Sequence, residues 1–208
     1  MIEVREYDLP DFRISQSDND FEVCVWQPEN NYLVLGQSNH AETSLNTAEV
    51  LADKIVVYKR PSGGETVILS PQMLVISVLF KTGQLKNPKD YFFQINEAII
   101  DALKSLGVSD LRQKGISDIA IGEKKILGSS IYRKPDKVFF HAVLNVSENT
   151  ETIARYIKHP AKEPDYRLGR THEDFVTSLS SAGHQLDYTE LAHRVKSEIK
   201  KIRNKLIV

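Results

Sequence analysis

Residues 58–69, YKRPSGGETVIL, form the most informative stretch of this chain: a basic patch runs into a tight Ser-Gly-Gly loop with β-branched residues on both sides. The flanking runs are typical of strands. The paired glycines Gly63 and Gly64 can adopt positive φ, and consecutive amides in such a loop can form an anion-binding concavity. Arg60 can add charge-assisted hydrogen bonds to a phosphate or a carboxylate. Taken alone, the loop is more simply a glycine-rich turn with chance basic neighbours.

A second unusual stretch, ISDIAIGEKKILGSS, occupies residues 116–130. Within it, Lys125 follows a predicted hairpin turn and precedes a Gly-Ser-Ser sequence. A lysine on a strand near a glycine loop is a compact positive charge that can polarise a carboxylate oxygen and stabilise a transferring phosphoryl group. The alternative is a solvated surface lysine, because 27 Lys and Arg residues leave many candidates.

Strand patterns dominate the middle of the chain, and helices do not separate them regularly. The expected strands are Phe21–Trp26 and Tyr32–Leu35 as a hairpin, Ile55–Tyr58, Thr66–Leu69, Met73–Phe80, and several short antiparallel ones between Ile116 and Leu144. The expected helices are Ala41–Lys54, 88–106, a short one within Thr171–Ser181 and a terminal one at about 186–206. Residues 1–20 show no clear element. These patterns predict an α/β protein of the α+β type, with a mixed, mainly antiparallel sheet flanked by helices.

The composition is ordinary for a soluble globular protein, with 41% hydrophobic and 26% charged residues. A formal charge of −1 gives no overall attraction to nucleic acid or to an anionic membrane, so we expect neither as a partner. No apolar run approaches the ~20 residues that span a bilayer, and the charged N-terminus does not resemble a signal peptide. Cys24 is the only cysteine, which excludes an internal disulfide and fits a cytoplasmic location.

Read together, the two stretches resemble the superfamily of lipoate-protein ligases, octanoyltransferases and biotin-protein ligases, and within it the catalytic domain of lipoate-protein ligase A. Members carry an Arg-x-Ser/Thr-Gly-Gly-Gly-Ala-Val-like loop, an Asn-Asp segment with a following Lys-Ile-Ser-Gly-Ser-Ala, and a strand histidine before an apolar-Asn tract. The corresponding sequences here are RPSGGETV at 60–67, Ser117-Asp118 with KILGSS at 125–130, and HAVLN at 141–145. Trp26-Gln27 and GQSN at 36–39 also match, so the resemblance covers roughly residues 20–180.

The resemblance implies a fold like that of biotin ligases and of the catalytic core of class II aminoacyl-tRNA synthetases. It also implies a reaction in which lipoate or octanoate attacks ATP, with Mg²⁺, to give an acyl-adenylate. A lysine of a lipoyl carrier domain then displaces AMP. It places Lys125 at the acyl carbonyl and the α-phosphate, and Asp118 at the nucleotide or at Mg²⁺. The residues that it places around the acyl chain and the nucleotide are Arg60, Ser62, Gly63, Gly64, Glu65, Thr66, Val67, Gly128, Ser129, Ser130 and His141.

The sequence departs from the family pattern at several positions. Glu65 replaces the third loop glycine, Ser117 replaces the asparagine, and residues 70–72 replace a His-Asp pair. After the match, about one helix remains, so we expect a single catalytic domain over residues 1–208 without an accessory domain, which a separate subunit would then supply. An ATP-independent lipoyl or octanoyl transferase or amidotransferase is one alternative, and a non-catalytic lipoyl-binding module is another.

Several other residues allow both a functional and a purely structural interpretation. His141 could orient a ligand group or could be a satisfied strand histidine. The polar residues of 159–172 could cap the mouth of an active site or bind the carrier, although a solvated loop is simpler. Cys24 is read as a packed side chain rather than a nucleophile, and the histidines are too scattered for a structural zinc site. The apolar stripe of the terminal helix is expected to dock on its own domain; the alternative is that it forms an interface with a partner protein.

Overall fold

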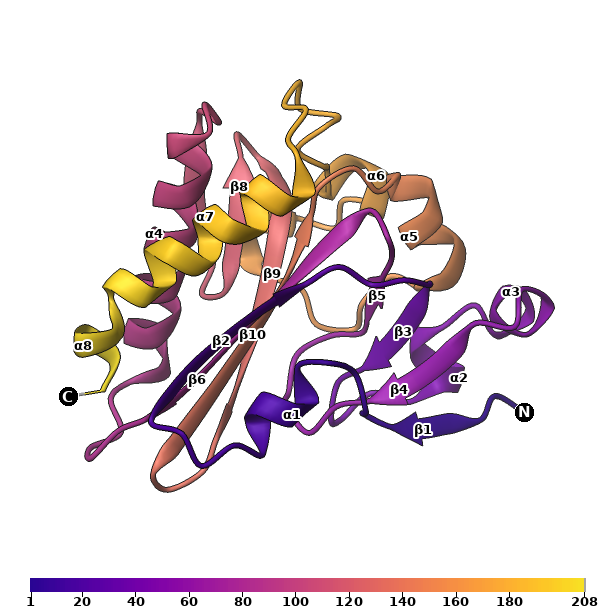
Figure 1. The fold of residues 1–208 in the computed structure, drawn as a ribbon. Helices are drawn as coiled ribbons and strands as arrows, with labels where there is room; N and C mark the ends of the chain where they lie inside the picture. The colour runs from indigo at the N-terminus through magenta and orange to yellow at the C-terminus, as the bar shows by residue number, and fades with distance from the viewer. Residues whose placement is uncertain (208) are drawn as a thin grey trace.

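Two β-sheets packed against each other, with helices on their outer sides, make up the computed structural model, which describes residues 1–207 (Figure 1). The larger sheet is antiparallel throughout. Its strands, in order across the sheet, are β2 (Phe21–Trp26), β6 (Met73–Lys81), β10 (Lys137–Asn145), β9 (Lys124–Arg133), β8 (Asp118–Ile121) and β7 (Leu111–Lys114).

The smaller sheet is mixed. Its strands, in order, are β1 (Val4–Glu6), β4 (Val56–Lys59), β3 (Tyr32–Leu35) and β5 (Val67–Leu69). The pairs β1–β4 and β4–β3 are parallel, whereas β3–β5 is antiparallel. The expected fold class is therefore confirmed, with the strands divided between two sheets.

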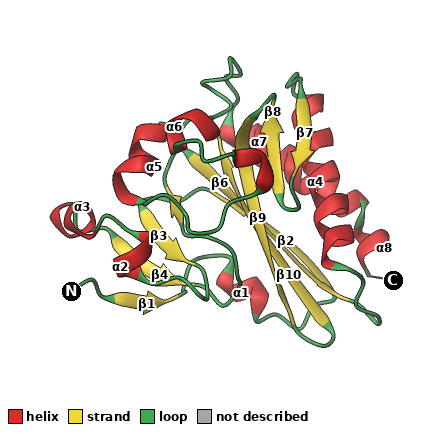
Figure 2. Ribbon diagram, turned by 180° about the vertical axis from the view of Figure 1, so that it is seen from behind, coloured by secondary structure: helices red, strands yellow, loops and turns green. Residues whose placement is uncertain are grey.

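The helices α4 (Pro88–Ser105) and α7 (Tyr188–Lys201) cover one face of the larger sheet (Figures 1 and 2). Asn87 caps α4 by accepting a hydrogen bond from the backbone amide of Lys89, and Pro88 is pre-organised for the first turn. Alternating apolar residues on this face form the main core with both helices. This core includes Leu74, Ile76, Val78, Phe80, Phe140, Ala142, Leu144, Tyr91, Ile95, Ile99, Leu191, Val195 and Ile199.

The opposite face of the larger sheet packs on the smaller sheet. Val34 and Leu69 of the smaller sheet join Val75 of β6 in one cluster between the sheets. The outer face of the smaller sheet is covered by short helices. The remaining helices are α1 (Phe12–Ser15), α2 (Ala41–Ser44), α3 (Thr47–Ala52), α5 (Thr150–Tyr156), the 3₁₀ turn η1 (Asp165–Arg167), α6 (His172–Phe175) and α8 (Arg203–Leu206). Within residues 1–207, none of the helices has both the length and the apolar character that crossing a membrane requires.

The expected hairpin of the first two strand patterns is wrong. β2 pairs with β6 at the edge of the larger sheet, whereas β3 lies between β4 and β5 in the smaller one. Leu33, Val34 and Leu35 are at most 2% exposed, so β3 is an interior strand that needs a partner on each side. A hairpin with β2 would occupy one of these positions.

The single helix expected over residues 41–54 is two helices, α2 and α3. Leu45 between them is extended and forms a β-bridge with Ile157. The backbone amide of Asn46 donates to the carbonyl of Tyr156, and its side chain donates to the carbonyls of Ala154 and Arg155. The backbone is thus tied to the end of α5 instead of continuing as a helix.

Three other boundaries differ from expectation. The N-terminal twenty residues contain the strand β1, which pairs with β4, and the helix α1, whose Phe12 packs against the apolar cluster between the sheets. The helix expected within 171–181 is only α6, which Thr171 caps through the amide of Asp174. The terminal helix breaks at Ile202 into α7 and α8, and its apolar stripe is buried in the main core.

Candidate functional site

The face of the larger sheet that is turned away from α4 and α7 carries most of the residues singled out in the sequence. Pairing across the strands places Ser130 opposite His141, and Gly128 opposite both Val143 and Asp118. A β-bulge shifts the β8–β9 register so that Lys125 pairs with Ala120, two residues from Asp118. The bulge therefore puts Lys125 on the same face as Asp118 and Gly128.

Lys125 forms an ion pair with Asp118 directly over Gly128. The Lys125 Nζ to Asp118 Oδ1 distance is 2.9 Å, and the two side chains are 28% and 6% exposed. A Cβ added to Gly128 would lie 2.6 Å from Lys125 Nζ, which is too close for any real contact. Glycine at position 128 thus leaves the space in which the ammonium group lies.

The segment from 159 to 177 packs on the end of this ion pair. The Tyr166 hydroxyl donates to Asp118 Oδ2 at 2.8 Å, and the amide of Thr177 donates to the carbonyl of Lys125 at 2.9 Å. Burial, together with the charge of Asp118, raises the pKa of Tyr166 well above its ordinary value, so its hydroxyl stays protonated. The guanidinium of Arg167 is buried over the ring of Phe175. Tyr166 and Arg167 of the polar cluster therefore pack beside the ion pair, whereas His159 and Asp165 are exposed.

The Ser-Gly-Gly loop lies against the same face of β9. Ser130 Oγ donates to the carbonyl of Gly63 at 2.9 Å, which joins the two informative stretches directly. Gly64 has a φ of 87°, a conformation that glycine adopts without strain. Within residues 1–207, no hydrogen bond uses the backbone amides of Gly63 and Gly64. These two amides are therefore candidate donors for an anionic ligand.

Arg60 points into the loop instead of toward solvent. Its side chain donates to Ser62 Oγ at 3.0 Å and to the carbonyls of Val34, Gly63 and Glu65 at 3.1, 2.8 and 2.8 Å. Desolvation lowers the pKa of Arg60 to about 10, so it remains charged at neutral pH. Arg60 therefore holds the loop in shape, and most of its donors are already used.

A second turn supports the loop from behind. The amide of Gln37 donates to the carbonyl of Ser62 at 2.9 Å. A Cβ added to Gly36 would lie 1.9 Å from the carbonyl oxygen of Gly64. Asn39 lies beside Glu65, with Nδ2 3.4 Å from its carboxylate. The GQSN turn and the glycine loop thus form one unit in which only glycine fits at position 36.

His141 lies at the end of a short hydrogen-bonded chain from Arg60. Ser62 Oγ accepts from Arg60 and forms a second hydrogen bond with Nε2 of His141 at 2.6 Å, whose direction depends on the His141 tautomer. Burial, and then the nearby Arg60 charge, lower the pKa of His141 to about 3. His141 is therefore neutral at physiological pH.

The neutral state of His141 predicts a pH dependence of stability. Because its pKa is lower in the folded than in the unfolded chain, the unfolded chain takes up the proton first as the pH falls below 6.5. We expect this group to lower the free energy of unfolding by about 1–2 kcal/mol between pH 7 and pH 5. In His141→Gln, whose amide oxygen can still accept from Ser62, this part of the loss should vanish in urea unfolding at the two pH values. Equal losses in both proteins would show that the folded protein does not hold His141 in its neutral form.

A buried polar network beside His141 was not expected from the sequence. Tyr7 Oη and Ser77 Oγ each donate to the carboxylate of Asp11 at 2.8 Å. Ser77 pairs with His141 across β6 and β10. Burial raises the pKa of Asp11. Residues 1–20 carry no pattern that could have revealed this network.

The other predicted site residues lie around this centre in different ways. Ser129 faces the opposite side of β9, where its hydroxyl donates to the carbonyl of Ser117. Thr66 is buried beside Asn39, and Val67 packs in the cluster between the sheets. Cys24 is half-buried, and burial raises the pKa of its thiol, as expected of a packed side chain.

The predicted Mg²⁺ contact rests on Asp118 alone. Both of its carboxylate oxygens are already engaged, one by Lys125 and the other by Tyr166. Within residues 1–207, no three His, Cys, Asp or Glu side chains come together as a metal site. The chain therefore offers no all-protein cage, and a Mg²⁺ ion would need phosphate oxygens and water for most of its ligands.

Fold and site define the class of this protein. The chain is similar in structure to a bipartite lipoate protein ligase of Thermoplasma acidophilum, which was described together with its E2 lipoyl domain. The TM-score is 0.78 at 17% identity, over 96% of this chain and 82% of that one. A lipoate-protein ligase A bound with ATP gives the same TM-score at 17% identity, over 96% and 84%. At such identities the likeness establishes the fold.

The chain belongs to the lipoyl protein ligase A/B catalytic domain family, whose model matches residues 11–200. One relative is lipoate-protein ligase A of Psychrobacter cryohalolentis, which is 31% identical over 133 residues. The match covers 62% of this chain and 37% of that relative, so the aligned part is well under half of that protein.

Proposed function

We propose that this protein is an enzyme that attaches lipoate, or a similar medium-chain acid such as octanoate, to a lysine of a carrier domain through an acyl-adenylate. The observation that carries the proposal is the position of Lys125. Its ammonium group lies over Gly128, on the same face of β9 on which Ser130 donates to the carbonyl of Gly63 in the glycine loop. A cation and unpaired amides on one face suit an acyl phosphate, which is anionic at the phosphate and polar at the carbonyl.

The proposed first step joins an oxygen of the acid to the α-phosphorus of ATP and breaks the bond to the β-phosphate, so that pyrophosphate leaves. Lys125 would then exchange its contact with Asp118 for one with the acyl and phosphate oxygens. The amides of Gly63 and Gly64 would donate to the same anion. Tyr166 would keep Asp118 in place while the ammonium group moves.

In the second step, the neutral amine of the acceptor lysine attacks the acyl carbonyl, AMP leaves with the electron pair of the broken bond, and the nitrogen releases a proton to water. The negative charge that develops on the carbonyl oxygen is stabilised by a fixed cation within reach, which is the role proposed for Lys125. A Mg²⁺ ion bound by the phosphates would neutralise further charge. This chemistry requires ATP, so we place the protein in the cytoplasm.

The partners proposed are a lipoyl carrier domain and an accessory subunit. The accessory subunit is suggested by the Thermoplasma ligase, which is described as bipartite. We further propose that residues 1–208 act as a single catalytic domain. The Glu65 carboxylate lies 3.4 Å from Asn39 Nδ2, and we propose that this contact holds it away from the bound anion.

Pyrophosphate release tests the proposed activity. With ATP, Mg²⁺ and lipoate, we expect pyrophosphate and lipoyl-AMP without any carrier, and a carrier gaining the mass of one lipoyl group when an apo-E2 lipoyl domain is added. Transfer from an acyl carrier protein without ATP, and without pyrophosphate, would instead identify an ATP-independent transferase. Binding of lipoate with neither reaction, in the presence of accessory subunits, would identify a binding module.

A further inference from the structure

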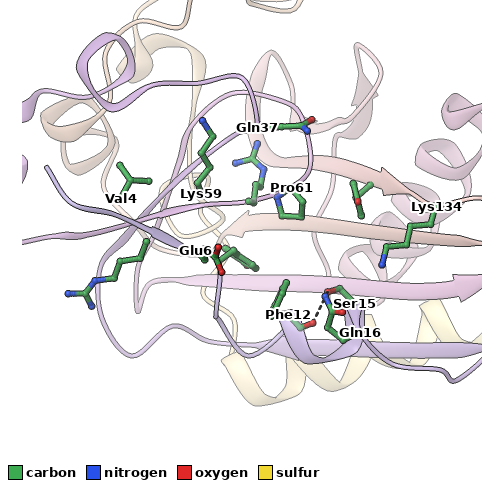
Figure 3. A pocket seen from close by; sticks show the side chains of 13 residues that line it. Val4, Glu6, Phe12, Ser15, Gln16, Gln37, Lys59, Pro61 and Lys134 are labelled. Carbon is green, nitrogen blue, oxygen red and sulfur yellow. Dashed lines mark hydrogen bonds between the residues drawn. The ribbon is translucent and has the colours of Figure 1, made fainter.

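A hollow of about 560 Å³ opens on the outer side of the glycine loop (Figure 3). It lies beside Arg60 and Pro61 rather than between Gly64 and Lys125, so it is separate from the ion pair. Residues from both sheets and from α1 surround it. Its apolar wall includes Val4, Phe12, Pro61 and Tyr132.

The rim of the hollow is cationic. Four of its lining residues are positively charged and one, Glu6, is negative; the cations are Arg5, Lys59, Arg60 and Lys134. The whole chain has a formal charge of −1, so this is a local concentration of positive charge. Such a patch attracts an acidic partner and orients it during encounter.

The four cationic side chains differ in how many hydrogen bonds and ion pairs they form within the protein. Arg60 is committed to the glycine loop, and Lys59 donates to the carbonyl of Asn39. Arg5 forms only an exposed pair with Glu3 at 3.5 Å, which contributes little. Lys134 is exposed and forms no ion pair within residues 1–207. Arg5 and Lys134 are thus available to a partner.

The hollow and the proposed reaction centre share one strand. Gly128, Ser130 and Tyr132 alternate along one face of β9, with Lys125 Nζ over the first and the hollow beside the last. Four residues of an extended strand span about 13 Å. A domain of about 100 residues has a radius of gyration near 13 Å, so its surface can cover both places at once.

We propose that this hollow is the docking point for an acidic surface of the acceptor domain, an inference that rests on the proposed function. An apolar side chain of the acceptor would pack on Phe12, Pro61 and Tyr132. Flanking carboxylates would pair with Lys134 and Arg5, while the acceptor lysine reaches toward Gly128. An apolar centre inside a polar rim is the usual make-up of a protein interface, and here the rim carries positive charge.

The double variant Arg5→Glu/Lys134→Glu tests this proposal. We expect its Kd for an apo-E2 lipoyl domain, measured by titration calorimetry, to rise about tenfold or more, and the wild-type Kd to rise with salt. The KM for that domain should rise similarly, with kcat within about twofold at saturation. Pyrophosphate release from lipoate and ATP alone should be unchanged. Arg194→Glu, which changes one charge on the exposed surface of α7, should leave all of these values as in the wild type.

An unchanged Kd in the double variant overturns the docking proposal, as does a wild type that does not bind the domain. A rise in KM for lipoate or ATP instead of the domain would show that the hollow takes a small anion, which also overturns it. The proposed function fails separately, through the absence of pyrophosphate release in the wild type. Even if the wild type releases no pyrophosphate, the calorimetric Kd values for the domain still test the docking proposal.

Discussion

Lys125→Ala is expected to lower the rate of lipoyl transfer by about 10²–10³-fold, the usual effect of removing one group that stabilises charge in a transition state. The variant should also unfold at a lower urea concentration than the wild type. Asp118 is 6% exposed, and without the ammonium it keeps only hydroxyl partners, Tyr166 and Ser117. Leaving a buried carboxylate without its ion partner costs about 1–3 kcal/mol. The loss of activity is therefore accompanied by a loss of stability.

A second change separates these two effects. In Lys125→Ala/Asp118→Asn, the buried negative charge is removed together with its partner, so most of the lost stability should return while the activity stays low. Lys125→Arg keeps the ion pair but places a larger, planar cation over Gly128, and should be stable but slow. Single-turnover transfer and urea unfolding of the four proteins measure both quantities. Near-wild-type transfer by either alanine variant would show that Lys125 is not at the reaction centre.

Sequence patterns predicted elements whose signals are local. The helix expected at 88–106 is α4, because its apolar periodicity is bounded by Pro88 and Gly107. The sequence contained no comparable signal for which distant strands pair with each other. β2 lies next to β6 rather than β3, and the helix expected at 41–54 is interrupted by bonds from Asn46 to α5. Both errors come from tertiary contacts that override local preference.

The candidate site was predictable from the order of its motifs, and less so in its details. The glycine loop contacts Ser130 of β9, and Lys125 lies over Gly128 of the same strand, so the two stretches are neighbours, while their role stays a prediction. The orientation of the Arg60 side chain could not be predicted from the sequence, since an arginine beside a glycine loop can face the ligand or the loop. Tyr166 was visible only as one member of a polar cluster. Its bond to Asp118 depends on how the 159–177 segment folds back over the sheet.

Gly36→Ala is expected to be the most damaging single-methyl addition in the site. The new Cβ would lie 1.9 Å from the carbonyl oxygen of Gly64 and 2.8 Å from Asn39 Oδ1. The first contact is with backbone, so the glycine loop itself must move, and Arg60 then loses its fit to the carbonyls of Gly63 and Glu65. We expect a loss of at least about 2–3 kcal/mol in the free energy of unfolding, and little acyl transfer.

Two other glycines of the same unit provide matched comparisons. A Cβ added to Gly63 meets nothing within 4 Å, so Gly63→Ala should keep its stability within about 0.5 kcal/mol of the wild type. Gly64→Ala should fall between the two, because its φ of 87° costs an L-residue about 1–2 kcal/mol. A loss of transfer in Gly63→Ala without a loss of stability would place the ligand against that glycine. If Gly36→Ala unfolds at the same urea concentration as Gly63→Ala, the turn at 36–39 does not hold the loop.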